Sequence, residues 1–217
     1  MEQIHETMKG ATVTRMQVGP LATNCYLAQS GTELMLIDPG MASDRELEDV
    51  VTVIESTHAN LRWVVCTHGH LDHVSGADAV MSRFPTATLL MNPMEVALAR
   101  KPAHSSDLKM RSLSTMHTEP SPLAAGDELP LGLITYRIAA VPGHTPGGLV
   151  LIAEDHAFVG DTLLAGCVCG IPDQPTFDQL VTSIRTVLMT LPLATHIFPG
   201  HGKPTTIGAE RKNNPVL

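Results

Sequence analysis

The chain has 217 residues, of which 43% are apolar, and its formal net charge is −8 at pH 7. This length fits one domain, and the composition is that of a globular protein rather than a disordered one. The acidic balance argues against a nucleic-acid partner, which would favour a basic face. No apolar run approaches the ~18 residues of a membrane span, and the start, MEQIHETMKG, lacks the apolar stretch of a secretory signal. We therefore expect no membrane partner and a cytoplasmic location.

Strands and helices are predicted to alternate in the first half of the chain. Short strands are expected at residues 13–18, 24–28 and 33–37, and the last ends at the turn signal Asp38-Pro39-Gly40. Ser43-Asp44-Arg45-Glu46 is a capping box, and apolar residues then recur at helical spacing. These are Leu47, Val50, Val51 and Ile54. Further strands are expected at 61–66 and 86–91, and helices at 75–83 and 93–100.

The second half opens with the least regular segment, residues 101–122, which contains His104 and His117. We interpret it as a surface insertion or lid. Strands follow at 133–141, 148–153, 156–159 and 195–198, with a helix at 177–191. This alternation predicts an α/β or α+β class in layers, with residues 1–217 as one domain.

Four cysteines are present, too few for a disulfide scaffold at this length. They are Cys25, Cys66, Cys167 and Cys169. The last two are separated by a single residue, a spacing at which a mutual disulfide strains the backbone. We expect ordinary buried or loop cysteines.

The stretch THGHLDH, residues 67–73, places three histidines and an aspartate directly after the apolar run Trp63-Val64-Val65-Cys66. His68 and His70 are two apart, so an extended segment points both to one side. Asp72 and His73 follow, where a turn directs them back toward the same space. Neutral imidazoles and a carboxylate suit zinc or iron. The stretch therefore predicts a metal site. Its four ligands are too few to fill two such sites, so further ligands must come from elsewhere in the chain.

Three later segments repeat the pattern of an apolar strand followed by a ligand beside glycine. They are VPGHTPG around His144, FVGDT around Asp161 and IFPGHG around His201. Glycine beside a ligand lets the backbone turn tightly and approach closely. In this order, after apolar runs, the three segments are expected to meet the first one at an edge of the layers.

The series THGHLDH, PGHTPGG, GDTL and PGHG resembles the metallo-β-lactamase superfamily, and the resemblance extends from LATNCYL and LIDPG to the last histidine. It implies a four-layer αββα sandwich of two mixed β-sheets flanked by helices, with the site at one edge between the sheets. It also implies two divalent metal ions, with zinc expected first and iron or manganese as alternatives.

The resemblance assigns His68, His70 and His144 to one metal, and Asp72, His73 and His201 to the other. Asp161 is expected to bridge them. A metal-bound hydroxide would then be the nucleophile, because a metal lowers the pKa of its water to about 7. Asp72 is expected to act twice, as a ligand and as the catalytic group that orients the hydroxide.

Within the superfamily the pattern is similar to the short, single-domain glyoxalase II-like group, which hydrolyses hydroxyacylglutathione. The tail resembles that group at Thr206, Gly208, Glu210, Arg211, Asn214 and Pro215. Two departures concern glutathione: only 16 residues follow His201, and no Arg or Lys stands in the Ala165–Gly170 stretch. We expect a small-molecule thioester or ester substrate. The alternatives are a mononuclear-iron persulfide dioxygenase, a lactonase or β-lactamase-type hydrolase, and a non-catalytic metal-binding module.

Overall fold

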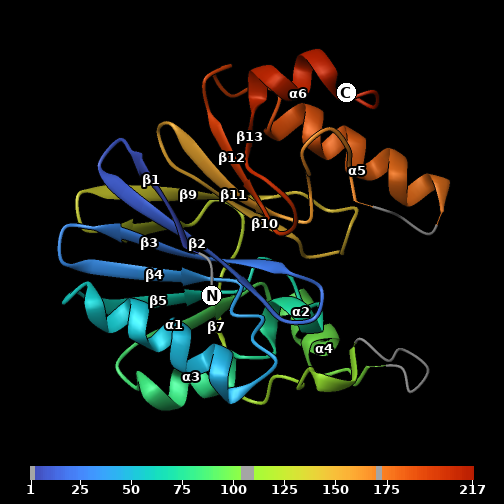
Figure 1. Cartoon of the computed structure of the whole chain (residues 1–217). Coiled ribbons are helices and arrows are strands. Elements are labelled where there is room, and N and C mark those ends of the chain that lie inside the picture. The colour runs from blue at the N-terminus through green and yellow to red at the C-terminus, as the bar shows by residue number, and fades with distance from the viewer. Residues whose placement is uncertain (1–2, 104–109, 170–172) are drawn as a thin grey trace.

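The computed structural model of the chain describes residues 3–103, 110–169 and 173–217. Within these residues the strands form one seven-stranded and one six-stranded sheet, stacked face to face with helices on both outer sides (Figure 1). The first sheet has the order β1-β2-β3-β4-β5-β6-β7 and the second β13-β12-β11-β10-β9-β8. The predicted four-layer sandwich is confirmed.

Both sheets are mixed. Strands β1 to β4 pair antiparallel and β4 to β7 parallel, whereas in the second sheet β11 and β12 alone among the described strands pair parallel. The first sheet contains β1 (Gln3–Met8), β2 (Ala11–Val18), β3 (Thr23–Ser30), β4 (Glu33–Ile37), β5 (Asn60–Val65), β6 (Thr88–Met91) and β7 (Ser121–Pro122). The second contains β8 (Glu128–Leu131), β9 (Ile134–Ala140), β10 (Leu149–Ile152), β11 (His156–Gly160), β12 (His196–Pro199) and β13 (Thr205–Thr206).

The helices divide between the two outer faces. Against the first sheet lie α1 (Asp44–Ser56), α2 (Leu71–Val74) and α3 (Ala77–Arg83), and the short η1 (Pro93–Glu95), α4 (Val96–Ala99) and η2 (Met110–Ser112) continue that side. Helices α5 (Gln174–Val187) and α6 (Ile207–Asn213) cover the second sheet on the opposite side (Figure 1).

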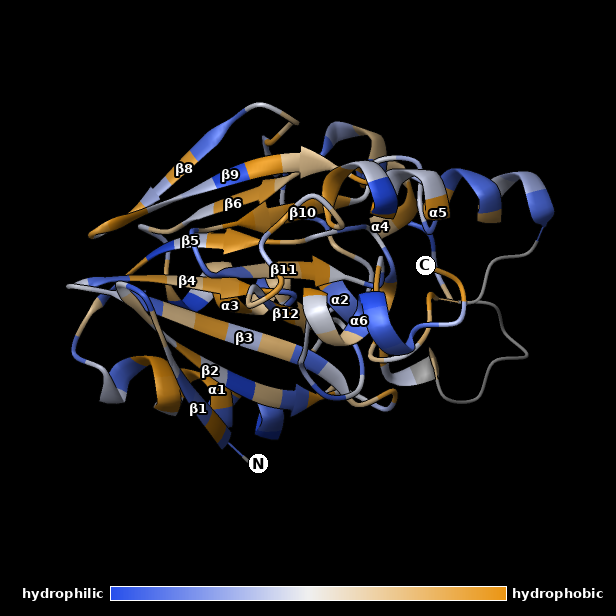
Figure 2. Ribbon diagram, turned by 90° about the horizontal axis from the view of Figure 1, so that it is seen from above, coloured by the Kyte–Doolittle hydropathy of each residue, from blue (hydrophilic) through white to orange (hydrophobic). Residues whose placement is uncertain are grey.

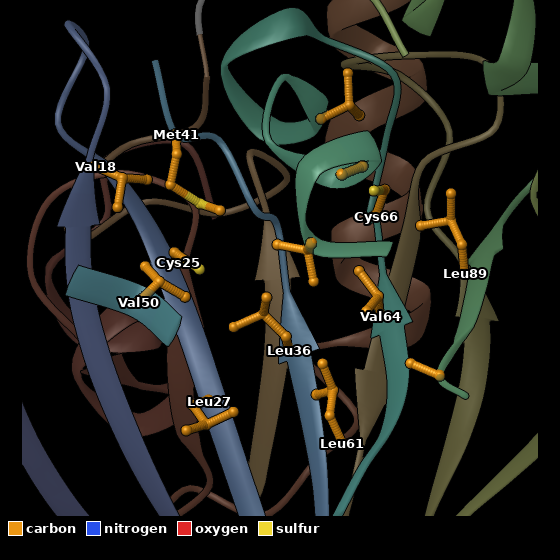
Figure 3. Close-up of a cluster of buried hydrophobic side chains, with 14 of the residues drawn as sticks. Val18, Cys25, Leu27, Leu36, Met41, Val50, Leu61, Val64, Cys66 and Leu89 are labelled. Atoms are coloured by element: carbon orange, nitrogen blue, oxygen red, sulfur yellow. The ribbon is translucent and has the colours of Figure 1, made fainter. Parts of the chain in front are cut away.

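Strand β4 shows how the sequence builds three apolar layers. Leu34 and Leu36 pack against the helices, whereas Met35 and Ile37 pack between the sheets, as the period of two in a strand requires. Figure 2 shows the apolar residues concentrated in central strands such as β5, β10 and β11. Figure 3 shows the layer between sheet and helices, where Val50 of α1 meets Leu36 and Cys25.

Helix α1 begins where the capping box predicts. Ser43 caps the helix by accepting the N–H of Glu46. The Glu46 side chain does not return to Ser43, because its two oxygens accept the N–H groups of Gly19 and Ala42. It thereby connects the helix start to the β2–β3 turn. Val50 is fully buried, which stabilises the fold by roughly 1.5–3 kcal/mol.

Several elements differ from the sequence prediction. The helix expected at 75–83 is α3, which begins only at Ala77, and the unpredicted short helix α2 precedes it across Ser75 and Gly76. Strands β1 and β8 and helix α6 were not predicted. Their residues are half exposed or short, so the apolar periodicity is weak.

The predicted lid at 101–122 lies partly outside the described residues, which exclude 104–109 and therefore His104. Of the described part, Leu113 and Met116 are buried in the layer beneath α1 and α3. The N–H groups of His117 and Thr118 donate to Asp78 of α3. Residues 113–118 are therefore packed on the domain, and a lid role for the segment stays a prediction. No helix in the described part of the chain is both long enough and apolar enough to cross a bilayer.

Gly40 tests the contact between the β4 end and α2. A Cβ at Gly40 would lie 1.6 Å from the carbonyl oxygen of Asp72, so Gly40→Ala must push α2 away. We predict a loss of about 2 kcal/mol in the free energy of unfolding, measured by urea denaturation. Zinc binding should also weaken, because α2 contains the expected ligands Asp72 and His73. Gly31→Ala is the control, because Gly31 has φ +58° but open space around its Cβ position. It should cost about 1–2 kcal/mol and leave zinc binding unchanged. If Gly40→Ala bound zinc as tightly as the wild-type protein, the contact between Gly40 and α2 would not be needed to position the ligands on α2.

Candidate metal centre

The carboxyl ends of five strands meet at one edge of the sandwich. β4 and β5 run parallel in the first sheet, and β9, β11 and β12 share one direction in the second. Every predicted ligand segment follows one of these strands. Two backbone hydrogen bonds connect the sheets here, from Asn24 N to Gly200 O and from Leu149 N to Thr67 O. The topology therefore brings together segments that are up to 133 residues apart, from His68 to His201.

Three histidines form the first group. The Nδ1 atom of His70 lies 3.0 Å from Nε2 of His68 and 3.0 Å from Nε2 of His144. A neutral imidazole carries one N–H, so the single proton of His70 satisfies at most one of these contacts. Three ring nitrogens directed at one point are the arrangement that a metal ion requires.

Asp72, His73 and His201 form the second group. Asp72 and His73 lie on the single turn of α2 rather than on the loop that the sequence suggested, and both are buried. The Oδ2 atom of Asp72 is 3.1 Å from Nε2 of His201 and 3.5 Å from Nε2 of His73. Thr23 of β3 also donates its hydroxyl to this oxygen, at 3.1 Å.

Asp161 lies between the two groups. Its Oδ1 is 3.6 Å from Nε2 of His73, and its Oδ2 is 3.7 Å from Nε2 of His144 and 3.5 Å from Nε2 of His201. One carboxylate thus faces nitrogens of both groups. All seven side chains singled out in the sequence meet in this space.

Two buried atoms in the centre test whether a cation fits. Nε2 of His73 and Oδ1 of Asp161 make no hydrogen bond, although the residues are 0% and 6% exposed. Burying polar atoms without partners costs about 1–3 kcal/mol each. A divalent cation between them satisfies both, and imidazole nitrogens with carboxylate oxygens are the donors that zinc, iron and manganese accept.

Asp38 orients the histidines from behind. Its carboxylate accepts Thr67 N–H at 2.7 Å, the Thr67 hydroxyl at 2.8 Å and Nδ1–H of His73 at 2.9 Å. Thr67 Oγ1 in turn accepts Nδ1–H of His68, at 3.1 Å. Each histidine then presents the lone pair of Nε2 to the centre. Because these hydrogen bonds occupy the Asp38 oxygens, we assign Asp38 to support rather than to metal binding.

Glu95 connects the two loops of the first group. It is fully buried, and it accepts Gly69 N–H at 2.8 Å and Gly147 N–H at 2.6 Å. Gly69 lies between His68 and His70, and Gly147 follows His144. Neither Glu95 nor Asp38 was a predicted site residue, because the sequence indicates only a helix at Glu95 and a turn at Asp38.

The protonation of the metal-free centre follows from burial and charge. Burial lowers the pKa of His68 and His70, and it lowers that of His144 to about 4. Burial also opposes charge on His73 and His201, but Asp161 and Asp38 raise the pKa of His73, and Asp72 raises that of His201. Burial disfavours ionised Asp72, yet His201 and His73 lower its pKa to about 2. The first group is therefore neutral, and the second holds protons beside carboxylates.

Glu95→Gln tests the connection between the two loops. The glutamine amide offers one acceptor and a donor where two acceptors are needed, so one backbone N–H loses its partner. We predict zinc affinity about 10–100-fold weaker, measured by competition with a chromophoric chelator, and a lower unfolding temperature. Glu119→Gln changes an exposed carboxylate paired with Arg100 and serves as the control. Equal zinc affinity in the two variants would refute this role for Glu95.

Comparison with known proteins places the fold and site in context. The model of the Metallo-beta-lactamase superfamily matches residues 18–201. Hydroxyacylglutathione hydrolase GloC of Haemophilus influenzae is 33% identical over 187 residues, which cover 84% of this chain and 86% of GloC. Two crystal structures are each 28% identical and match 94% of this chain and 99% of their own. BLEG-1 B3 metallo-beta-lactamase has a TM-score of 0.84, and TTHA1623 in a di-iron-bound form has 0.79. The chain thus belongs to the metallo-beta-lactamase superfamily, a superfamily of metallo-hydrolases.

Proposed function

We propose that this protein is a binuclear metal-dependent hydrolase of small-molecule thioesters or esters, most similar to hydroxyacylglutathione hydrolase. The observation that carries the proposal is Asp161, whose two oxygens face both histidine groups. A structural zinc site needs four ligands in a closed shell, whereas seven donors around one space suit two ions with positions left for water and substrate. TTHA1623, at 28% identity, is described in a di-iron-bound form, which supports two ions here.

Each side chain has a role in this proposal. His68, His70 and His144 would hold one ion, Asp72, His73 and His201 would hold the other, and Asp161, which faces both groups, would serve both. Two divalent cations would supply Lewis acidity and lower the pKa of water to about 7. Asp72 has its Oδ2 directed toward His201 and fixed by Thr23. Its Oδ1 is assigned the role of orienting the attacking water, so that no serine or cysteine nucleophile is needed.

A hollow beside His201 suits the acyl part of a substrate. It is lined by Leu164, Ala165, Cys167, His201, Gly202 and Lys203. Its apolar wall with one cation favours a small acyl group that carries a negative charge or a hydroxyl. The name of GloC supports a glutathione thioester as the first substrate to test, and that of BLEG-1 supports a β-lactam as the second.

The test of function is a substrate panel for the zinc-loaded and the iron-loaded protein. The panel contains S-lactoylglutathione, a simple acyl thioester, a lactone, a cephalosporin and glutathione persulfide. We expect thiol release from the thioesters, no oxygen consumption, and complete loss of activity on chelation. Oxygen uptake with the persulfide and no hydrolysis would establish the dioxygenase alternative. Hydrolysis that survives removal of all metal would overturn the proposed mechanism.

Asp161→Ala tests the shared carboxylate. Because Asp161 contacts both groups, its removal should reduce bound zinc from about two ions per chain to about one, and kcat by about 10²-fold or more. Elemental analysis and thiol-release kinetics measure the two effects. Asp178→Ala removes an exposed carboxylate of α5 and should change neither. Two ions per chain and an unchanged rate in Asp161→Ala would contradict the bridging role.

The raised pKa of His73 and His201 predicts that the two ions leave at different pH. A metal must displace protons from these two histidines, so affinity at the second group falls as pH falls. The first group has lowered pKa values and stays deprotonated to lower pH. On lowering the pH from about 8 to about 5.5 at fixed free zinc, one ion should leave first. His201→Ala should abolish this separate first step. Loss of both ions at the same pH from the wild-type protein would contradict the predicted order.

A further inference from the structure

The segment after Asp161 forms a tight turn at the rim of the centre. Leu164 and Cys167 exchange backbone hydrogen bonds, with Leu164 N to Cys167 O at 3.0 Å and Cys167 N to Leu164 O at 3.2 Å. Gly166 has φ +80° inside this turn, a conformation that suits glycine. The chain therefore reverses here, and the residues after Cys167 return toward Asp161.

Glu210 of α6 anchors the turn from outside. It is 3% exposed, and its carboxylate accepts the N–H of Gly166, at 3.0 Å to Oε2. The hydroxyl of Thr205 and the amide of Asn214 donate to the same carboxylate, at 2.6 and 2.8 Å. The C-terminal motif that resembles the glyoxalase II-like tail is thus a support for the 164–169 segment.

This support places the sulfur of Cys169 beside the metal donors. The Cys169 thiol donates to Oδ2 of Asp161 at 4.0 Å. Sγ, a carboxylate oxygen of Asp161 and a ring nitrogen of His144 all lie within 4.8 Å of one another. From bond lengths of about 2.3 Å to sulfur and 2.1 Å to oxygen, two donors of one zinc separated by an angle of about 110° lie about 3.6 Å apart. The distance of 4.0 Å between Sγ and Oδ2 of Asp161 is close to this value.

Cys169 contacts a carboxylate of the centre that a cation fits. Oδ1 of the buried Asp161 makes no hydrogen bond, and Oδ2 faces nitrogens of both His144 and His201. A thiolate is a strong ligand for zinc and iron, and metal binding removes the thiol proton. Cys167, only two residues away, is exposed and belongs to no such group of donors among the described residues.

We propose that the Cys169 thiolate is an additional ligand of the metal centre, bound on the His144 side. This inference rests on the proposed function, because it needs a metal at His144 and Asp161. A catalytic metal keeps a position open for water or substrate, and the thiolate takes such a position at rest. Substrate then competes with Cys169 for the metal.

Cobalt(II) in place of zinc tests the ligand spectroscopically, because a thiolate bound to cobalt gives charge-transfer absorption in the near ultraviolet. Visible d–d absorption reports cobalt on the histidines and carboxylates independently of sulfur. The wild-type protein and Cys167→Ser should show both features. Cys169→Ser and Cys169→Ala should lose the charge-transfer band and keep the visible bands.

Alkylation by iodoacetamide, read by peptide mass spectrometry, gives a second measurement that does not depend on the variants. Zinc should slow alkylation of Cys169 by about tenfold or more, and that of Cys167 by less than about twofold. Visible bands without a charge-transfer band, or with one that survives Cys169→Ser, would overturn the inference and leave the proposed function intact. Absence of any cobalt binding would overturn both.

Discussion

The carboxylate of Asp38 is the contact on which the arrangement of the centre depends. It sits one residue after β4, and it holds both the backbone and side chain of Thr67 after β5, as well as the ring of His73 on α2. Asp38 itself has φ +53°, a strained conformation for a residue other than glycine. The three hydrogen bonds, together with its own N–H to Val65 O, maintain that conformation. The same carboxylate fixes the ring of His73 directly and that of His68 through the Thr67 hydroxyl.

A second buried carboxylate performs the corresponding task between the sheets. Glu95 accepts the backbone N–H groups of Gly69, next to His70, and of Gly147, three residues after His144, so a residue of η1 connects the two loops of the first histidine group. Glu210 repeats the principle for the rim turn at Gly166. In all three cases a carboxylate accepts backbone N–H groups near the expected ligands. The donor atoms of the ligands therefore remain available to the centre.

The sequence predicted most of the strands and the proximity of the seven side chains, because their signals are local, and the binding of metal by these side chains stays a prediction. Apolar runs such as Val64-Val65-Cys66 form buried strands, and glycines mark the turns at His144 and His201. The supporting roles of Glu95 and Glu210 were missed because both residues act over long distances in the chain. In the sequence Glu95 looks like an ordinary helical glutamate, and Glu210 stands out only as part of the tail pattern. The start of α2 was also missed, because four residues carry too little periodicity to indicate a helix. Cys169 was expected to be an ordinary cysteine, since its proximity to Asp161 arises only from the turn at 164–167.

The proposed function requires that these seven donors hold two cations in one space. Crystals of the protein grown with zinc, and measured at wavelengths on both sides of the zinc absorption edge, test it most directly. We expect two anomalous peaks about 3.5–4 Å apart, one among His68, His70 and His144 and one among Asp72, His73 and His201, with Asp161 between them. Absence of anomalous density at this edge of the sandwich, or density only elsewhere in the molecule, would contradict it.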